Sequence, residues 1–246
     1  MSQVKPFVTL IRYTNNPEET IAMAARLCYS DADILDIKNN TESKDNAKFI
    51  SRLLSMGHLS AFEHASFTFG IEGVSRALLA QITRHRLASF SVKSQRYVSA
   101  THDDNTTFNY VIPPAIEELG EDAVDKYNMQ MATMQKWYTD WQIALGNNGE
   151  SSNEDARFVL PNASETKMII TMNARELMHF FSLRCCNRAQ WEIRDVAWQM
   201  LAQVVEVAPN VFKNAGPSCI NGKCSEGAKT CGKMQEVKQR REALKW

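Results

Sequence analysis

A cluster of cations without acids is the first feature of this sequence that suggests chemistry. The thirty residues from Gly73 to His102 contain no Asp or Glu. Five cations lie in this stretch: Arg76, Arg84, Arg86, Lys93 and Arg96. The planar guanidinium of arginine holds two phosphate oxygens at once, and the hydroxyls of a Ser-rich loop add donors. The stretch is therefore suited to binding a phosphoester. Arginine at a helix C-terminus also complements the helix dipole, worth about 0.3–1 kcal/mol, which explains Arg84 or Arg86 taken singly.

A second cationic block covers residues 167–188. It holds Arg175, Arg184 and Arg188 near a single Glu176. Arg175 and His179 are four residues apart, so they share one face of a helix. A helix with polar groups on two sides lines two pockets, or one pocket shared between subunits. The alternative is an ordinary surface helix.

Histidine and cysteine residues raise the question of a metal. The stretch Gly57–His64 holds two His and a Glu just before a strand, but its spacing matches no common zinc pattern. Cys219, Cys224 and Cys231 form a loose C-x4-C-x6-C series near the end of the chain. We predict no metal site, with a structural zinc at these cysteines, completed by Cys185 or Cys186, as the alternative.

The elements that must position these residues follow from periodicity and capping signals. Expected helices begin at Pro17 and at Ser43, the second ending at Gly57. Further expected helices cover 76–86, 115–145, 153–160, 173–183 and 189–207. Expected strands cover 65–71, 108–112 and 167–172. Residues 30–40 are expected to form a loop, and the Gly- and Cys-rich tail has no clear element. The pattern predicts a single α+β domain over 1–213, followed by a Cys-rich tail over 214–246.

Composition limits the function classes. The 246 residues carry 28 Lys and Arg against 28 Asp and Glu, so the net charge is zero, and 44% of residues are apolar. The chain has enough apolar residues to form a core, and its neutrality argues against non-specific nucleic-acid binding. No apolar run is long enough for a membrane span or a secretion signal, so we expect a cytoplasmic protein. A nucleic-acid-binding module that uses segments 76–96 and 167–188 remains the alternative.

Several motifs resemble one known family. Arg84-His85-Arg86, seven residues and then Ser94 resemble the RHR-x7-S motif of the flavin-dependent thymidylate synthases (the ThyX family). Other stretches resemble further blocks of that family in the same order. They are Gly57-His58 with Phe62-Glu63-His64, Ala156-Arg157 with Val159-Leu160-Pro161, Asn173-Ala174-Arg175, Leu183-Arg184, and Ala189-Gln190-Trp191-Glu192-Ile193. The resemblance covers about residues 15 to 210.

This resemblance implies an enzyme. It would make dTMP from dUMP, with methylenetetrahydrofolate as the carbon donor, NADPH as the reductant and FAD as the carrier of the hydride. It also implies a mixed or antiparallel sheet with several long helices, and a homotetramer whose active sites are shared between subunits. The two cationic blocks would then neutralise the pyrophosphate of FAD and the phosphate of dUMP.

The resemblance also assigns residues. The positions that match flavin contacts are Ser60, Arg84, His85, Arg86, Val92, Asn173, Arg175 and His179. The positions that match dUMP contacts are Gln81, Arg84, Ser94, Gln95, Arg96, Arg157 and Arg184. Arg96 and Arg157 are the expected phosphate ligands, and Arg184 is the expected catalytic residue, favouring ionisation at uracil N3 by charge stabilisation. Ser94 is expected to donate to the phosphate, because no His-Asp pair activates it as a nucleophile.

The sequence departs from the family at a few of these positions. Ser91 and Val92 stand where some members have Asn and Glu, and His179 stands where Asn is common. The imidazole of His179 still donates a hydrogen bond.

Overall fold

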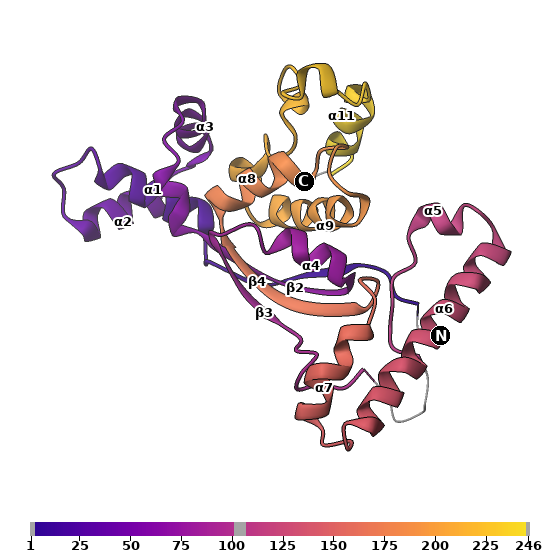
Figure 1. Ribbon diagram of the computed structural model, residues 1–246. Coiled ribbons are helices and arrows are strands. Elements are labelled where there is room, and N and C mark those ends of the chain that lie inside the picture. Colours follow the sequence, from indigo (N-terminus) through magenta and orange to yellow (C-terminus); the bar gives the residue numbers. More distant parts are fainter. Residues whose placement is uncertain (1–2, 101–106, 245–246) are drawn as a thin grey trace. The chain divides into compact units, whose positions relative to one another are not determined.

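Four strands form one antiparallel sheet in the order β1-β2-β4-β3 (Figure 1). The strands are β1 (Phe7–Tyr13), β2 (Ser66–Ser75), β3 (Ala88–Val92) and β4 (Glu165–Asn173). The computed structural model describes residues 3–100 and 107–244. The sheet and its accompanying helices confirm the α+β class expected from the sequence.

Alternating side chains explain the two central strands. The buried apolar positions are Phe67, Phe69 and Ile71 on β2 and Met168, Ile170 and Met172 on β4. Side chains of a strand point alternately to its two faces, so these residues form a buried apolar face on each strand. The hydroxyls of Thr68 on β2 and Thr171 on β4 lie 2.9 Å apart and link the two strands. The predicted strands 65–71 and 167–172 are confirmed, and both extend by a few residues.

The described residues cluster into two compact units, and all four strands contribute residues to both. The first unit holds residues 3–7, 71–84, 91–100 and 107–169. The second unit holds residues 8–70, 85–90 and 170–244.

Helices make up most of the second unit. They are α1 (Pro17–Leu27), α2 (Ile34–Glu42), α3 (Ala47–Met56), α8 (Ala174–Arg184), α9 (Trp191–Val207), α10 (Pro209–Phe212) and α11 (Met234–Glu242). Short 3-10 helices are η1 (Ser60–His64), η3 (Ser218–Ile220) and η4 (Gly227–Lys229). Helix α8 packs beside α9 (Figure 1). The Trp198 indole Nε1–H donates to the Cys185 carbonyl at 3.1 Å, which ties α9 to the end of α8.

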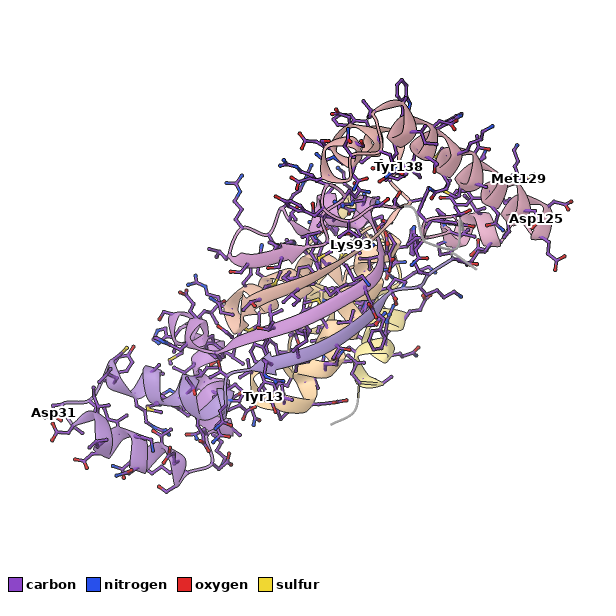
Figure 2. All side chains as sticks on the ribbon, turned by 90° about the horizontal axis from the view of Figure 1, so that it is seen from below. Tyr13, Asp31, Lys93, Asp125, Met129 and Tyr138 are labelled. Carbon is purple, nitrogen blue, oxygen red and sulfur yellow. The ribbon has the colours of Figure 1, made fainter. Side chains whose placement is uncertain are left out.

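The first unit is built from α4 (Arg76–Ile82), α5 (Pro114–Glu117), α6 (Glu121–Ala144), α7 (Glu150–Ala156) and η2 (Arg157–Val159). Figure 2 shows two contrasting side chains of α6, with Met129 64% exposed and Tyr138 fully buried. The Tyr138 hydroxyl donates to Asn153 Oδ1 of α7 at 3.1 Å. Asn153 Nδ2 donates in turn to the Arg96 carbonyl at 3.1 Å. This buried network fixes the loop that carries Arg96.

Capping residues fix several helix ends where the sequence predicted them. Ser75 accepts from the Leu78 amide at 3.1 Å at the start of α4, and Asn173 accepts from the Glu176 amide at 2.9 Å at the start of α8. Gly57 ends α3 with φ 71°, a left-handed conformation that suits glycine. The expected helix ends at Ser75, Asn173 and Gly57 are confirmed.

Other elements differ from the expectation. The sequence predicts a loop over residues 30–40, but residues 34–42 form α2, which packs against α1. The expected helix 115–145 is divided into α5 and α6 by Gly120 at φ 100°. Residues 88–92 form β3 rather than loop, and the expected strand 108–112 is reduced to bridges at Tyr110. In each case tertiary packing or a backbone turn outweighs local propensity.

The tail after residue 213 has a defined structure. The buried Arg241 guanidinium on α11 donates to the carbonyls of Phe212 (2.8 Å), Lys213 (2.8 Å) and Ala215 (3.1 Å). These carbonyls lie at the end of α10 and just after it, where helix carbonyls lack intrahelical donors, and the Phe212 carbonyl also accepts from the Ala215 amide at 2.9 Å. The division into 1–213 and 214–246 stays a prediction. Across residues 3–100 and 107–244, no helix is both long and apolar enough to cross a membrane.

Candidate functional site

Three charged or polar side chains of the second unit form a hydrogen-bonded line, and two of the three are buried. His85 and Glu176 are 5% and 6% exposed. Glu176 Oε1 lies 3.0 Å from His85 Nδ1, and the Arg184 Nε–H group donates to His85 Nε2 at 3.0 Å. Both ring nitrogens of His85 therefore have partners. The sequence predicted roles for His85 and Arg184, but not for Glu176.

The environment of His85 keeps its ring neutral. Burial lowers the pKa of His85 below its usual 6.5, and the nearby Arg184 and His179 lower the pKa further, while the hydrogen bond and charge of Glu176 oppose them. The Phe180 ring packs edge-on against His85 at 4.9 Å between centroids, and the His179 ring lies at 6.1 Å. The imidazole is therefore uncharged at pH 7.

A cavity of about 450 Å³ lies in the second unit. Its lining includes Tyr29, His58, Ser60, His64 and Arg175. A cavity of this size falls in the range of small-molecule and cofactor sites. Arg175 forms an ion pair with Glu63, and both side chains are about half exposed. The guanidinium and the Ser60 hydroxyl give this cavity donors for an anionic group.

The other residues that the resemblance assigns to flavin in this unit differ in exposure. Arg86 and His179 are exposed. Asn173 uses its Oδ1 to cap α8, so its Nδ2 amino group is the part that suits an acceptor on a ligand. The assigned residues Arg84 and Val92 belong to the first unit.

In the first unit, Arg96 is neutralised by acids from a distant part of the chain. Its guanidinium pairs with Glu150 at 2.8 Å and with Glu154 at 2.6 Å, and its side chain is 46% exposed. It also lies 5.6 Å from the centre of the Tyr97 ring. The segment 73–100 thus contains no acidic residue, but the folded chain places Glu150 and Glu154 beside it. The acids on α7 were missed because only the tertiary fold places them beside Arg96.

Arg157 converges on the same place. Its Nε–H group donates to the backbone carbonyl of Glu154 at 3.0 Å. Arg96 and Arg157 therefore both contact Glu154, Arg96 at its carboxylate and Arg157 at its backbone. Arg157 also lies near Arg76. The pKa of Arg76 is lowered mainly by burial and, to a smaller extent, by the positive charge of Arg157. Three guanidinium groups, those of Arg76, Arg96 and Arg157, therefore lie near one another in this unit, and Glu150 and Glu154 offset the charge of Arg96.

Ser94 and Gln95 lie in the turn before Arg96. The Ser94 hydroxyl oxygen accepts from the amides of Arg96 (3.1 Å) and Tyr97 (3.3 Å). These two bonds do not use the hydroxyl proton, so Ser94 is suited to donate to a ligand rather than to act as a nucleophile. Gln95 lines a cavity of about 30 Å³, close to the volume of one water molecule.

The end of α4 differs from the sequence interpretation. The helix ends at Ile82, and the Arg84 amide donates to the Gln81 carbonyl at 3.3 Å in the turn that follows. Gln81 is half-buried and Arg84 is exposed. Gln81 therefore lies on α4, whereas Arg84 lies in the turn after it, so the two residues do not share one helix as expected.

The two assigned sets divide between the units. Apart from Arg84 and Val92, the residues assigned to flavin belong to the second unit. Apart from Arg184, those assigned to dUMP belong to the first unit.

No metal site is formed by the described side chains as they stand. In the part of the chain that the structure describes, no group of three or more His, Cys, Asp or Glu side chains is arranged to hold a metal. Cys185 is buried, which raises its pKa, and Cys219 is also buried. The expectation of no metal stays a prediction.

Comparison with known proteins identifies close relatives. The family described as "Thymidylate synthase complementing protein" matches residues 9–210. A flavin-dependent thymidylate synthase of Geobacter sulfurreducens is 48% identical over 232 residues, which cover 94% of this chain and 96% of that protein. One from Clostridium tetani is 46% identical over 242 residues, with 94% and 95% covered.

Solved structures agree with these relatives. The flavin-dependent thymidylate synthase ThyX of Helicobacter pylori, complexed with FAD and dUMP, superposes with a TM-score of 0.61 at 25% identity. The match covers 85% of this chain and 99% of that one. The UMP/dUMP methylase PolB of Streptomyces cacaoi, bound with 5-Br dUMP, gives a TM-score of 0.66 at 25% identity, with 87% and 96% covered.

Proposed function

This chain belongs to the flavin-dependent thymidylate synthases, and we propose that its two side-chain clusters divide the two nucleotides of the reaction between them. The enzyme methylates dUMP to dTMP, with methylenetetrahydrofolate as carbon donor and FAD and NADPH as the reducing system. Bound FAD supplies the hydride chemistry, while the protein supplies position and electrostatics. The roles of individual residues below are proposals.

The cavity of the second unit fits part of FAD. Its volume of about 450 Å³ and its lining by Ser60 and Arg175 suit a dinucleotide that carries a pyrophosphate. The exposed Arg86 and His179 and the Asn173 amide add donors in the same unit. His85, Arg84 and Val92 complete the proposed flavin set, although the buried His85 acts through its neighbours rather than by open contact.

The cluster of the first unit fits the phosphate of dUMP. The convergence of Arg96 and Arg157 on Glu154 is the observation that carries this assignment. A phosphate competes with the carboxylates of Glu150 and Glu154 for the Arg96 guanidinium, because both anions match the planar fork of arginine. Ser94 donates its hydroxyl proton to a phosphate oxygen, and Gln81, Arg84 and Gln95 supply further polar contacts to the nucleotide.

Arg184 is the proposed catalytic residue. Its charge stabilises the anion that develops when uracil N3 ionises, and this makes C5 more nucleophilic. A fixed cation does this well only when it is already oriented, and the Nε bond to His85 at 3.0 Å provides that orientation. The residue's contribution is therefore expected in the transition state more than in binding.

The remaining proposals concern assembly and location. Large apolar side chains are exposed, among them Phe158 at 83%, and exposed apolar surface favours association between copies. This supports the proposed homotetramer with shared sites. A cytoplasmic location stays a prediction. The nucleic-acid alternative for 76–96 and 167–188 gains no support, since Glu150 and Glu154 neutralise Arg96.

A direct test compares two arginine variants in the purified enzyme. Arg184→Ala should lower dTMP formation by about 100-fold or more while the protein keeps its bound flavin. Arg12→Ala is the control, because Arg12 is exposed on β1 and bonds to the carbonyl of its neighbour Ile11. Normal turnover by Arg184→Ala contradicts the role of Arg184. A protein that binds neither FAD nor dUMP contradicts the whole proposal.

A further inference from the structure

Glu176 lies at the start of α8 and has no part in the roles assigned above. Its carboxylate reaches away from its own helix to Nδ1 of His85, whose other nitrogen accepts from Arg184. We propose that Glu176 is a positioning residue, which selects the protonation state of His85 and thereby holds Arg184 in its working orientation. This inference rests on the proposed role of Arg184.

The hydrogen-bonding capacities of the three groups allow a single arrangement of protons. An ionised carboxylate only accepts, so the bond to Glu176 requires a proton on His85 Nδ1. A guanidinium only donates, so the bond from Arg184 requires a lone pair on His85 Nε2. The neutral ring with its proton on Nδ1 satisfies both bonds. The other neutral tautomer and the imidazolium both place an N–H group against the N–H of Arg184.

Glu176 is itself held firmly. Its amide donates to the capping oxygen of Asn173 at 2.9 Å, and its side chain is 7% exposed. The position in the first turn of α8 also favours a negative charge, because the N-terminal end of a helix is the positive end of its dipole. The carboxylate is therefore held in place to accept the hydrogen bond from His85 Nδ1.

The other neighbours of His85 fix its ring plane but not its tautomer. Phe180 is fully buried and packs edge-on against the imidazole, so it restricts rotation. His179 lies on α8 with its ring 6.1 Å away. The charged or titratable groups that act on His85 from the described residues are thus Glu176, Arg184 and His179. Among these three, Glu176 is the acceptor that lies within hydrogen-bond distance of Nδ1.

Loss of the carboxylate should change turnover more than binding. Without Glu176 the ring can carry its proton on Nε2, and the Arg184 Nε–H group then loses its acceptor. A guanidinium that moves from its position binds the ground state about as before but stabilises the developing anion less. Loss of a positioning residue therefore lowers kcat and leaves the KM for dUMP nearly unchanged.

The tautomer can be read directly by solid-state ¹⁵N NMR of histidine-labelled, ligand-free protein. The chain has five histidines, and the His85→Gln variant identifies the His85 signals by their disappearance. We expect a protonated Nδ1 and an unprotonated Nε2 in the unmodified protein. We expect the Glu176→Gln variant to keep this state, since the amide oxygen still accepts, and the Glu176→Leu variant to lose it. A protonated Nε2 in the unmodified protein overturns the proposal, and this result does not depend on whether a Glu176 variant folds.

Kinetics on the flavin-loaded enzyme give the second readout. Glu176→Leu should lower kcat by about tenfold or more, as loss of an orienting partner does elsewhere, with the KM for dUMP changed by less than about twofold. Glu176→Gln should keep kcat within about threefold. Glu192→Gln is the matched control, because Glu192 is also buried in the first turn of a helix. An unchanged kcat in Glu176→Leu, or a change of tautomer in Glu192→Gln, contradicts the proposal.

Failure of the premise can be told apart from failure of this inference. If Arg184→Ala turns over normally, the role of Arg184 is wrong. The tautomer measured in ligand-free protein still decides whether Glu176 sets the state of His85.

Discussion

Arg96 and Glu154 form an ion pair of 2.6 Å, although they come from well-separated segments of the chain. Arg96 is a proposed phosphate ligand, so this pair must open or rearrange when dUMP binds. We predict that Arg96→Ala raises the KM for dUMP by about 10- to 100-fold, the loss expected from one charged hydrogen-bonding partner. Steady-state kinetics with varied dUMP measure this. A KM that does not change assigns the phosphate elsewhere.

Glu154 should act as a competitor of the phosphate. We predict that Glu154→Gln lowers the KM for dUMP by up to about fivefold, because an ion pair between half-exposed groups is worth about 0.2–1 kcal/mol. Raising the salt concentration should shrink the difference between the variant and the parent enzyme. Glu72→Gln serves as the control, since Glu72 pairs with Lys167 on the sheet. Weaker dUMP binding by Glu154→Gln argues that Glu154 orders the site instead.

Tyr138 links the stability of the first unit to the position of Arg96. Tyr138→Phe removes a hydroxyl that donates to Asn153 and accepts from the Ala100 amide at 3.2 Å. We predict a loss of about 1–3 kcal/mol in the free energy of unfolding, since buried partners are left unsatisfied. Urea denaturation measures it. Tyr13→Phe is the control, because the Tyr13 side chain is 46% exposed, and an equal loss in both variants contradicts the prediction.

Much of the fold was predictable from local signals. The alternation of Phe67, Phe69 and Ile71 and the caps at Ser75 and Asn173 indicate elements that the structure contains. Helix α2 was not predictable, because its nine residues bury few side chains and depend on packing against α1. Strand β3 was not predictable either, because it lies in a Ser-rich segment and depends on pairing with β4, which is distant in sequence.

The candidate site was predictable in its cations but not in its acids. The cationic residues are concentrated in two short segments of the sequence, 73–102 and 167–188, and the RHR-x7-S motif lies in the first of them. The acids are each distant in sequence from the group that they pair with: Glu63 from Arg175, Glu150 and Glu154 from Arg96, and Glu176 from His85. Pairings across such distances in sequence depend on the tertiary fold, which spacing alone does not contain.

Arg241 should be important for the stability of the tail. Its buried guanidinium satisfies the carbonyls of Phe212, Lys213 and Ala215, so Arg241→Ala leaves these acceptors without that donor. We predict a loss of about 2 kcal/mol in the free energy of unfolding and faster proteolysis after residue 213. Arg240→Ala is the control, because Arg240 is about half exposed and pairs with Asp195. Equal proteolysis of both variants contradicts the prediction.

His85 should make the stability of the apoprotein depend on pH. Its folded pKa lies below 6.5, so as the pH falls the unfolded chain takes up the proton first. The contribution of His85 is therefore complete above about pH 6.5 and is lost as the pH falls toward the folded pKa, by at most about 1.4 kcal/mol per pH unit. Urea denaturation between pH 7.5 and pH 5, at about half-unit steps, measures this slope.

The His85→Gln variant separates this residue from the other titrating groups. Glutamine does not titrate, so its stability should fall less steeply than that of the parent protein below about pH 6.5. The difference between the two slopes belongs to His85, because Glu176, Arg184 and His179 are present in both proteins. Parallel slopes would mean that His85 takes up its proton equally well in the folded and unfolded chain. That result would contradict a neutral, buried ring between Glu176 and Arg184.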